Sequence, residues 1–337
     1  RLIHFMATMA TMGSGKEGEG RVSLEGDQEA QELSKTESSE WNELRRRMFC
    51  GRGLNMLLYL NPAMALFHGA LFAVTLAVGN LNLSVPVYNI AYDLEVTRTE
   101  GGQTSWKLLP AGGTVCMDLK FTWMTACFFL ISAVFHLLNC TAWRRWYIAG
   151  IAECRCPSRW IEYTFSASLM AVLIAYGAGM NIMLLLVSVF FLSATTMFFG
   201  HVTELLARPT RDGNSWTEPW HYRLQAHFMG YVPQLTAWFL IIYQFHYTAA
   251  GAELTVNGEP SDGSRGMPPF VYGIVWGELI VFWSFGLIQL VFTSISPKFY
   301  PYGELAYQIM SLVSKGILGL VLIVNVLMLS NFEDIYQ

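Results

Sequence analysis

The chain has 337 residues, of which 53% are apolar and 14% are charged, and its formal net charge is −4. Soluble proteins carry about 25% charged residues, so this composition indicates a membrane protein and excludes a disordered chain or a small disulfide scaffold. The small net charge and the scattered basic residues give no sign of a nucleic-acid partner.

The first 53 residues differ in composition from the rest of the chain. They include the run GSGKEGEG, mix acidic with basic residues and contain few aromatic ones. Such a composition is typical of a flexible tail, and it matches neither a signal peptide nor a transit peptide. We therefore expect a cytoplasmic tail at 1–53, a membrane domain at 54–330 and a short outer C-terminus at 331–337.

Long stretches without charged residues follow the tail. A helix needs about 20 mostly apolar residues to cross roughly 30 Å of hydrocarbon. On this basis we predict an all-α membrane protein with seven transmembrane helices, at about 54–80, 118–141, 157–178, 181–204, 221–248, 269–295 and 302–330.

Two of the predicted connections are long. The segment 81–117 begins with the β-rich LSVPVYNIAYDLEV and continues with TEGGQTSWKLL, which predicts an ordered outer β-hairpin with Gly101 and Gly102 in its turn. The segment 249–268 is rich in Gly, Pro, Ser and Asp, and we expect a solvated loop there.

The distribution of Lys and Arg predicts how the chain is oriented, because cytoplasmic loops are enriched in both. With the tail inside, the four outer basic residues are Arg98, Lys107, Lys120 and Arg265. The twelve inner ones are Arg45, Arg46, Arg47, Arg52, Arg144, Arg145, Arg155, Arg159, Arg208, Arg211, Arg223 and Lys298. We therefore predict a cytoplasmic N-terminus and an extracellular C-terminus.

Lys315 is the most informative residue of the sequence. At 1.5 Å per helical residue, the nearest charges on its segment, Glu304 and Glu333, are about 16 Å and 27 Å away, so Lys315 lies near mid-membrane. A lysine there costs about 2.5–3.5 kcal/mol on insertion scales. Three interpretations are open: an ion pair between helices, a proton or ion relay, and a neutral amine that condenses with an aldehyde.

Glu162 is the predicted partner of Lys315. It lies one to two turns inside the third helix, which contains few other charges, and a buried cation needs an anion nearby. The alternative is a pair with Arg159, three residues earlier on the same helix face. We expect Arg159 to point to cytoplasmic water, which leaves Glu162 for Lys315.

Other polar residues in the helices are less specific signals. His68 and His136 lie at related depths, so they predict either satisfied core residues or a polar cluster that holds water. Glu278 predicts either a neutral, hydrogen-bonded carboxyl group or part of a proton pathway, and Glu204 is expected at the inner interface. Aromatic side chains of the fifth and sixth helices, Tyr231, Trp238, Phe282, Trp283 and Phe285, would line a pocket if a ligand is present.

The chain resembles the heliorhodopsins, a family of retinal-binding seven-helix proteins with inverted topology. The resemblance is carried by RWIEYTFSASLM at 159–170, PPFVYGI at 268–274 and YGELAYQIMSLVSK at 302–315. It implies a rhodopsin-like bundle, a retinal cofactor that is all-trans in the dark, and a light sensor that pumps few or no ions. It also implies a homodimer in the lipid membrane and a downstream signalling partner that the sequence does not identify.

The resemblance also implies roles for single residues. Lys315 matches the lysine that forms the retinal Schiff base, Glu162 matches its counterion, and Ser311 matches a serine close to both. His68 and His136 match the inner polar cluster. The remaining retinal-pocket residues that it suggests are Ser166, Met170, Tyr231, Pro233, Phe282, Trp283 and Gln289.

Two other functions are compatible with parts of the sequence. The first is a light-gated or light-driven proton conductor that uses Glu162, Glu278 and Glu204. The second is a membrane zinc hydrolase, suggested by His201 and Glu204 at helical spacing and by His68, His136, His227 and His246 elsewhere. The hydrolase leaves Lys315 unexplained, so we predict a protein without enzymatic activity.

Overall fold

The computed structural model describes Ser39 and residues 52–98, 104–110, 112–251, 253–256, 259–265 and 267–327. The chain divides into two compact units, Arg1–Arg46 and Arg47–Gln337, and all elements below belong to the second. Most of the predicted tail, the turn glycines Gly101 and Gly102, and the C-terminal residues 331–337 lie outside the described residues.

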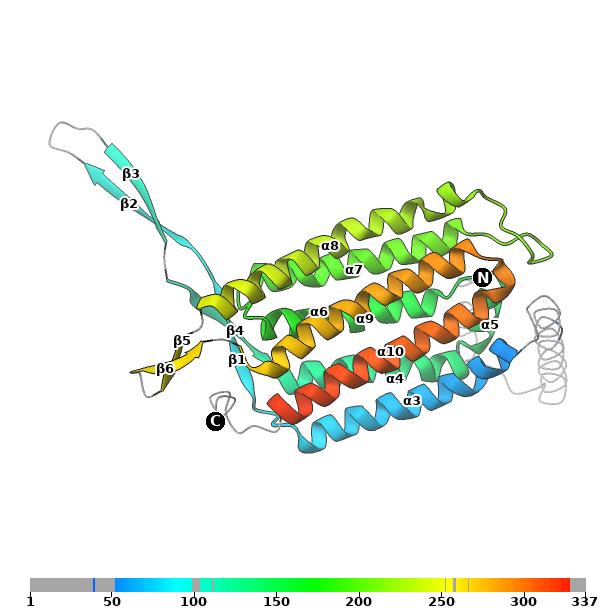
Figure 1. Ribbon diagram of the computed structural model, residues 1–337, viewed down its shortest axis with the longest axis horizontal. Helices are drawn as coiled ribbons and strands as arrows, with labels where there is room; N and C mark the ends of the chain where they lie inside the picture. Colours follow the sequence, from blue (N-terminus) through cyan, green and yellow to red (C-terminus); the bar gives the residue numbers. More distant parts are fainter. Residues whose placement is uncertain are drawn as a thin grey trace, which may run out of the picture. The chain divides into compact units, whose positions relative to one another are not determined.

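Seven helices of 20 or more residues make up most of the described part (Figure 1). They form because their segments are apolar and almost free of charge, and a helix satisfies its own backbone groups. Pro157 and Pro269 lie in the first turn of their helices, where no backbone donor is needed. The helices are α3 (Arg52–Val78), α4 (Phe121–Cys140), α6 (Pro157–Gly177), α7 (Met183–Leu206), α8 (Trp220–Gly251), α9 (Pro269–Ser294) and α10 (Tyr300–Leu322).

Five of the seven long helices lie in segments that are long and apolar enough to cross a membrane. These are α3, α4, α7, α9 and the segment Pro297–Leu327, which contains α10. The other two long helices are more polar. α6 carries Arg159, Glu162 and several hydroxyl side chains, and α8 carries Arg223, His227 and other polar residues. The described part of the chain is thus mostly helical with five clear spans, and the count of seven spans stays a prediction.

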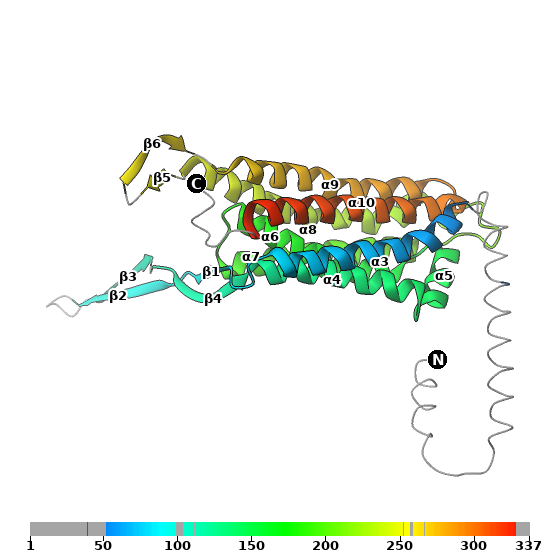
Figure 2. The same cartoon turned by 90° about the horizontal axis from the view of Figure 1, so that it is seen from below.

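The long helices run side by side, with strands at one end of the bundle and α5 (Arg144–Ala152) at the other (Figure 2). We call these the strand end and the α5 end. The sequence did not predict α5, because its RRWYIAGIA is short and begins with two arginines. A π-helical turn, Ile323–Leu327, continues α10 at the strand end.

The predicted hairpin is present as two consecutive strand pairs after α3, while its place on the outer side stays a prediction. β1 (Ser84–Asn89) pairs with β4 (Thr114–Lys120), and β2 (Tyr92–Arg98) pairs with β3 (Thr104–Pro110), both antiparallel. The backbone nitrogen of Tyr88 donates to the Asn181 carbonyl at 2.9 Å, which fastens β1 to the bundle.

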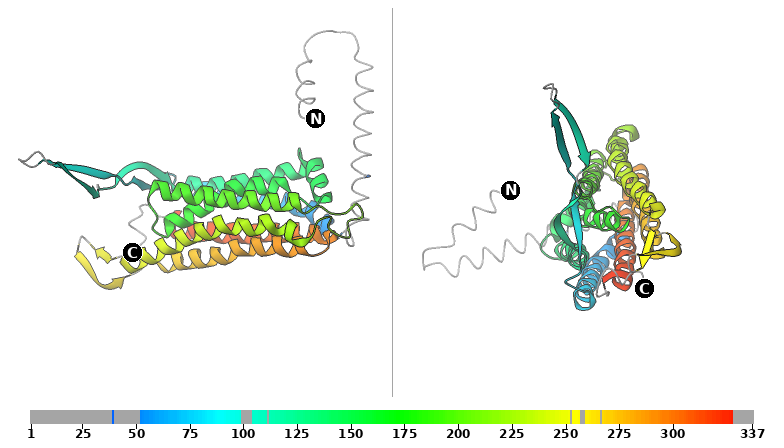
Figure 3. Two further views of the ribbon diagram at one scale, coloured as in Figure 1. Left: turned by 90° about the horizontal axis from the view of Figure 1, so that it is seen from above. Right: turned by 90° about the vertical axis from the view of Figure 1, so that its left-hand side faces the viewer.

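The segment 249–268 was expected to be a plain loop, and this expectation is wrong. β5 (Glu253–Val256) pairs with β6 (Glu259–Arg265) in a second antiparallel hairpin (Figure 3). The β-branched residues of ELTV favour a strand, and pairing satisfies backbone groups of the Gly- and Ser-containing partner segment, whose composition suggested a loop.

Candidate functional site

A buried ion pair lies at the centre of the site. Lys315 Nζ on α10 donates to Glu162 Oε1 on α6 at 2.6 Å, and both side chains are almost completely buried. Ser132 Oγ on α4 donates to the same oxygen at 2.7 Å, and Lys315 Nζ also contacts Ser311 Oγ at 3.0 Å. Three helices therefore hold one charged contact in an interior where an unpaired ion would be very unfavourable.

The predicted pair between Lys315 and Glu162 is thus present, while the expectation for Arg159 is wrong. Arg159 is 3% exposed and forms ion pairs with Glu204 on α7 and Glu304 on α10. Its guanidinium also lies 3.9 Å from the centre of the Tyr307 ring. A cation that has two carboxylates and an aromatic face around it gains little by reaching for water, so Glu162 is left to Lys315.

Glu204 is likewise buried, where the sequence suggested an interfacial residue. Besides Arg159, it accepts hydrogen bonds from Trp160 Nε1 at 2.7 Å, from Tyr300 Oη at 3.0 Å and from the Cys156 backbone at 2.9 Å. This network joins α6, α7 and α10 at the α5 end. Sequence reasoning missed Glu304, although Arg159, Glu204 and Glu304 share a depth near the ends of three helices.

Two tyrosines lie between the network and the central pair. Tyr163 Oη donates to the Tyr307 carbonyl at 3.2 Å, and Lys315 Nζ lies 5.1 Å from the centre of the Tyr163 ring. Tyr307 in turn lies beneath Arg159. The two charged clusters are therefore separated by aromatic side chains and share no ionic contact.

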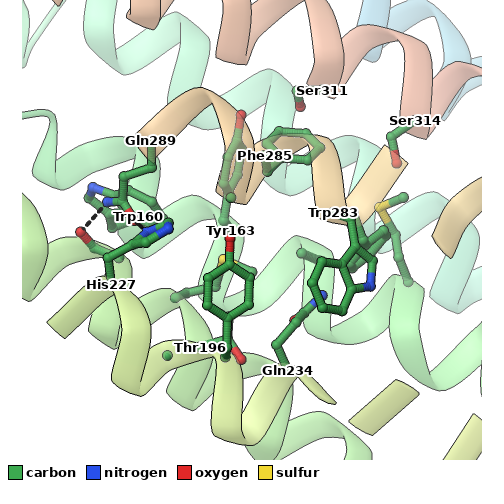
Figure 4. A pocket seen from close by; sticks show the side chains of 18 of the residues that line it. Trp160, Tyr163, Thr196, His227, Gln234, Trp283, Phe285, Gln289, Ser311 and Ser314 are labelled. Carbon is green, nitrogen blue, oxygen red and sulfur yellow. Dashed lines mark hydrogen bonds between the residues drawn. The ribbon is translucent and has the colours of Figure 1, made fainter. Parts of the chain in front are cut away.

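Lys315 is among the residues that line an apolar cavity. Figure 4 shows side chains of this lining, among them Ser311 and Ser314. The lining belongs to α6 to α10 and includes seven predicted pocket residues besides Lys315: Met170, Tyr231, Phe282, Trp283, Phe285, Gln289 and Ser311. Three other predicted pocket residues, Ser166, Pro233 and Trp238, are buried but do not line it. The lining residues are Trp160, Tyr163, Ala167, Met170, Thr196, Met197, Gly200, His227, Gly230, Tyr231, Gln234, Phe282, Trp283, Phe285, Gly286, Gln289, Ser311, Ser314 and Lys315.

Polar contacts order one wall of this cavity. His227 Nδ1 and Gln289 Oε1 lie 3.0 Å apart, and Gln289 Nε2 donates to the Gly200 carbonyl at 2.7 Å. Since Gln289 Oε1 only accepts, His227 must donate from Nδ1. Tyr231 and Trp283 stack with ring centres 5.4 Å apart. Sequence reasoning placed Gln289 in the pocket but missed the bond to His227, which joins two helices.

The two predicted histidines lie together near the pair. The rings of His68 and His136 are nearly parallel, with centres 5.8 Å apart. His136 Nδ1 contacts Asn61 Oδ1 at 2.9 Å, while both nitrogens of His68 and Nε2 of His136 are buried without a hydrogen-bond partner among the described residues.

Glu278 on α9 contacts α10 at the residue next to Lys315. Ser314, the residue before Lys315, donates to Glu278 Oε2 at 2.7 Å, and Glu278 Oε1 has no partner among the described residues. Among all residues that the structure describes, no three His, Cys, Asp or Glu side chains come close enough to hold a metal ion.

The heliorhodopsin family model matches residues 57–327 of this chain. Among solved structures, the light-driven proton pump of Coccomyxa subellipsoidea is 11% identical, with a TM-score of 0.52 over 82% of this chain and 98% of the other. Cyanorhodopsin of the cyanobacterium Tolypothrix sp. NIES-4075 is 13% identical, with a TM-score of 0.49 over 81% and 93%. The first similarity supports the fold alone. No curated protein sequence matches the chain.

Proposed function

Since this chain belongs to the heliorhodopsin family of membrane-embedded retinal photoreceptors, we propose that it is a light sensor with little or no ion pumping. The observation that carries the proposal is the buried pair of Lys315 and Glu162, in which Lys315 also lines an apolar cavity. A buried primary amine is the group that an aldehyde requires, and a carboxylate beside it stabilises positive charge on the nitrogen.

The residues of the cavity fit retinal, an apolar polyene with one aldehyde group. Lys315 would hold retinal through Nζ, and aromatic side chains such as Phe282, Trp283 and Tyr231 would enclose its polyene. Two flexible side chains could adjust the shape of the cavity to the ligand. Met170 and Met197 line the cavity, and unbranched methionine changes its rotamer easily.

Retinal, all-trans in the dark, supplies a light-driven isomerisation when it is bound. The protein's part is to hold the proton on Lys315 Nζ through Glu162 Oε1 and Ser311 Oγ. If the N–H bond of Lys315 turns away from Glu162, the carboxylate keeps only Ser132 as a described side-chain donor. These groups belong to α4, α6 and α10. Loss of the contact between Lys315 and Glu162 therefore changes the forces between three helices, and the resulting helix movement is the signal.

Reconstitution tests the binding of retinal, on which this function depends. The apoprotein should form a visible-absorbing pigment with all-trans-retinal, and borohydride should trap the ligand on a peptide that contains Lys315. A protein that inserts correctly but stays colourless would contradict the proposal.

A light-driven or light-gated proton conductor is the second candidate function, and Glu278 favours it. Its carboxyl group is 1% exposed, has one unpartnered oxygen among the described residues and is joined through Ser314 to the segment of Lys315. A carboxyl group in that position could extend a proton route from Lys315 toward the strand end, while Glu162 serves the other direction.

Whole-cell recording under illumination separates the two functions. A sensor should give no sustained photocurrent at any voltage when the inserted protein is pigmented. A conductor should give currents that disappear in Glu278→Gln and persist in Glu218→Gln, a control that alters an exposed carboxylate.

We also propose that the chain forms a homodimer through the β2–β3 hairpin. Tyr92, Leu94, Val96, Trp106 and Leu108 share one face of this hairpin by strand alternation and register, and each is more than 40% exposed. An isolated two-stranded hairpin is marginally stable in water, and an exposed apolar face marks an interaction surface.

The mass of the detergent-solubilised protein tests the dimer. Trp106→Glu puts a charge on the apolar face and should convert dimers to monomers in light-scattering measurements. Ser105→Glu changes the opposite face of the same strand and should leave the dimer intact. Dimers of equal stability in both variants would exclude this surface.

A further inference from the structure

A second cavity lies at the α5 end, between α3, α4 and α5. It has a volume of about 260 Å³ and combines apolar walls with two asparagines, an arginine and a tyrosine. We call it the inlet cavity. A cavity of this size with several polar partners holds several water molecules. Its lining residues are Leu57, Leu58, Asn61, Pro62, Asn139, Cys140, Arg144, Tyr147 and Ile148.

The walls of the inlet cavity present acceptors that need donors. Asn139 is 7% exposed, and its Oδ1 has no hydrogen-bond partner among the described residues. Pro62 lies inside α3 and has no N–H, so it cannot donate to the Leu58 carbonyl one turn earlier. Arg144, which lies at the start of α5, is exposed, so this wall of the cavity reaches the protein surface at the α5 end.

Asn61 connects the inlet cavity with the histidines. Its Nδ2 donates to the Leu57 carbonyl at 3.0 Å, which assigns the other end of the amide as oxygen. That oxygen lies 2.9 Å from His136 Nδ1, so His136 must donate from Nδ1. If the ring is neutral, Nε2 is then free to accept a proton from the interior.

A row of polar groups continues from His136 to the central pair. Ser132 lies one helical turn before His136 on α4 and donates to Glu162 Oε1 at 2.7 Å. His68 lies beside His136 with both nitrogens unpartnered among the described residues. Buried imidazole nitrogens without protein partners are the usual partners of internal water.

We propose that the inlet cavity is a water-filled passage through which His136 exchanges protons with the medium at the α5 end, with Asn61 as its gate. An amide oxygen accepts a hydrogen bond but does not pass a proton on. Exchange therefore occurs when the Asn61 side chain swings aside and water takes its place beside Nδ1. The use of this route by Lys315 rests on the proposed function, whereas the hydration of the cavity does not.

Thiol labelling of the apoprotein tests whether water fills the inlet cavity. Ile148 lines the inlet cavity and is 3% exposed, while Ile151 on the same helix is 1% exposed and does not line it. In a Cys140→Ser background, Ile148→Cys should react with the anionic sulfonatoethyl methanethiosulfonate at least tenfold faster than Ile151→Cys. Peptide mass spectrometry identifies the labelled residue.

Leu58→Cys serves as a second cavity variant if Ile148→Cys does not fold. Equal rates at the cavity position and at Ile151→Cys would show a dry cavity and overturn the proposal. Because no retinal is needed, this result is independent of pigment formation.

Deuterium exchange in the pigment tests the gate. After transfer to D₂O, the N–H of Lys315 should exchange at least tenfold more slowly in Asn61→Leu, where an apolar group of similar size closes the passage. It should exchange faster in Asn61→Ser, where water can fill the space. Vibrational spectroscopy of the bond between Lys315 and retinal measures the exchange rate in each variant.

Asn325→Leu is the matched control, because Asn325 also donates from Nδ2 to the carbonyl four residues earlier but lies at the strand end. This variant should exchange at the wild-type rate. If the substitutions merely disturbed the structure, the exchange rate of the Lys315 N–H would change in the same direction in Asn61→Leu and in Asn61→Ser. That result would contradict a gate. If the wild-type protein forms no pigment, the proposed function fails while the labelling result stands.

Discussion

Lys315 and Glu162 make one charged contact that depends on both residues. Removing one member of a buried pair leaves the other uncompensated, at a cost of about 3–5 kcal/mol. Ser132 reduces the cost for Glu162, since it already donates to Oε1. A substitution of Lys315 or Glu162 can therefore impair folding as well as pigment formation.

The first prediction concerns Lys315→Ala. The variant should insert into the membrane but give no visible pigment with retinal, because no other described lysine lines the cavity. The visible spectrum after adding retinal, followed by borohydride treatment, measures this. Lys298→Ala, which changes a lysine outside the long helices, should form normal pigment.

If Lys315→Ala alone fails to fold, the double variant Lys315→Ala, Glu162→Gln removes both charges and should recover expression. Covalent pigment in either variant would show that another residue holds retinal.

The second prediction concerns Glu162→Gln. The amide cannot supply negative charge, so the pigment should shift to a short-wavelength, deprotonated form, or strongly to the red if an external anion takes the place of the carboxylate. Spectra recorded over a pH range in chloride and in sulfate distinguish these results. Glu153→Gln, which alters an exposed carboxylate paired with Arg155, should leave the spectrum unchanged. An unaltered titration of Glu162→Gln would rule out its counterion role.

At the scale of elements, close packing of α6 on α7 depends on Gly200. A side chain at this position would overlap the Trp160 ring, and that ring also donates to Glu204. Small residues let helices approach closely where lipid provides no hydrophobic drive for association. Gly200 therefore positions Trp160 both for the ionic network and for the wall of the cavity.

The third prediction follows from this contact. Gly200→Ala should destabilise the protein by about 1–3 kcal/mol, the usual cost of overpacking, and should lower the temperature at which it unfolds in detergent. The control is Gly277→Ala on α9, where an added Cβ meets nothing within 4 Å. That change should be neutral or stabilising, by about 0.5–1 kcal/mol, because Ala favours a helix over Gly. Equal melting temperatures for the two variants would contradict this role of Gly200.

At the scale of the whole molecule, the basic residues are unevenly distributed between the two ends. Arg144, Arg145, Arg208, Arg211 and Lys298 lie in or near the connections at the α5 end. The strand end has fewer, and they belong to the hairpins. This asymmetry supports the orientation with the α5 end in the cytoplasm.

The fourth prediction tests that orientation. Protease applied to intact cells should remove an epitope placed after Gln337 and should spare one placed within residues 1–53. Permeabilised cells provide the control, because both epitopes should then be cleaved. Cleavage of only the N-terminal epitope in intact cells would reverse the assignment of the two sides.

The sequence by itself determined where the helices lie and which charges matter. Lipid tolerates few charges, so Lys315 was recognisable as an isolated cation in an apolar segment and Glu162 as a carboxylate inside the third helix. Their pairing was predicted because each needed an opposite charge and Arg159 was expected to face water. The helix bounds agree within about three residues for six of the seven helices, because charge and proline mark the ends; the predicted end of the seventh lies outside the described residues.

Only the tertiary structure decided the partners of Arg159, the bond from Asn61 to His136 and the inlet cavity. Arg159 and Glu304 are separated by 145 positions, and Asn61 and His136 by 75. Such contacts depend on how each helix is rotated and which helices are neighbours, and a linear pattern of charge and hydropathy specifies neither. A buried polar group must find a partner, but the packing of the whole bundle decides which one it meets.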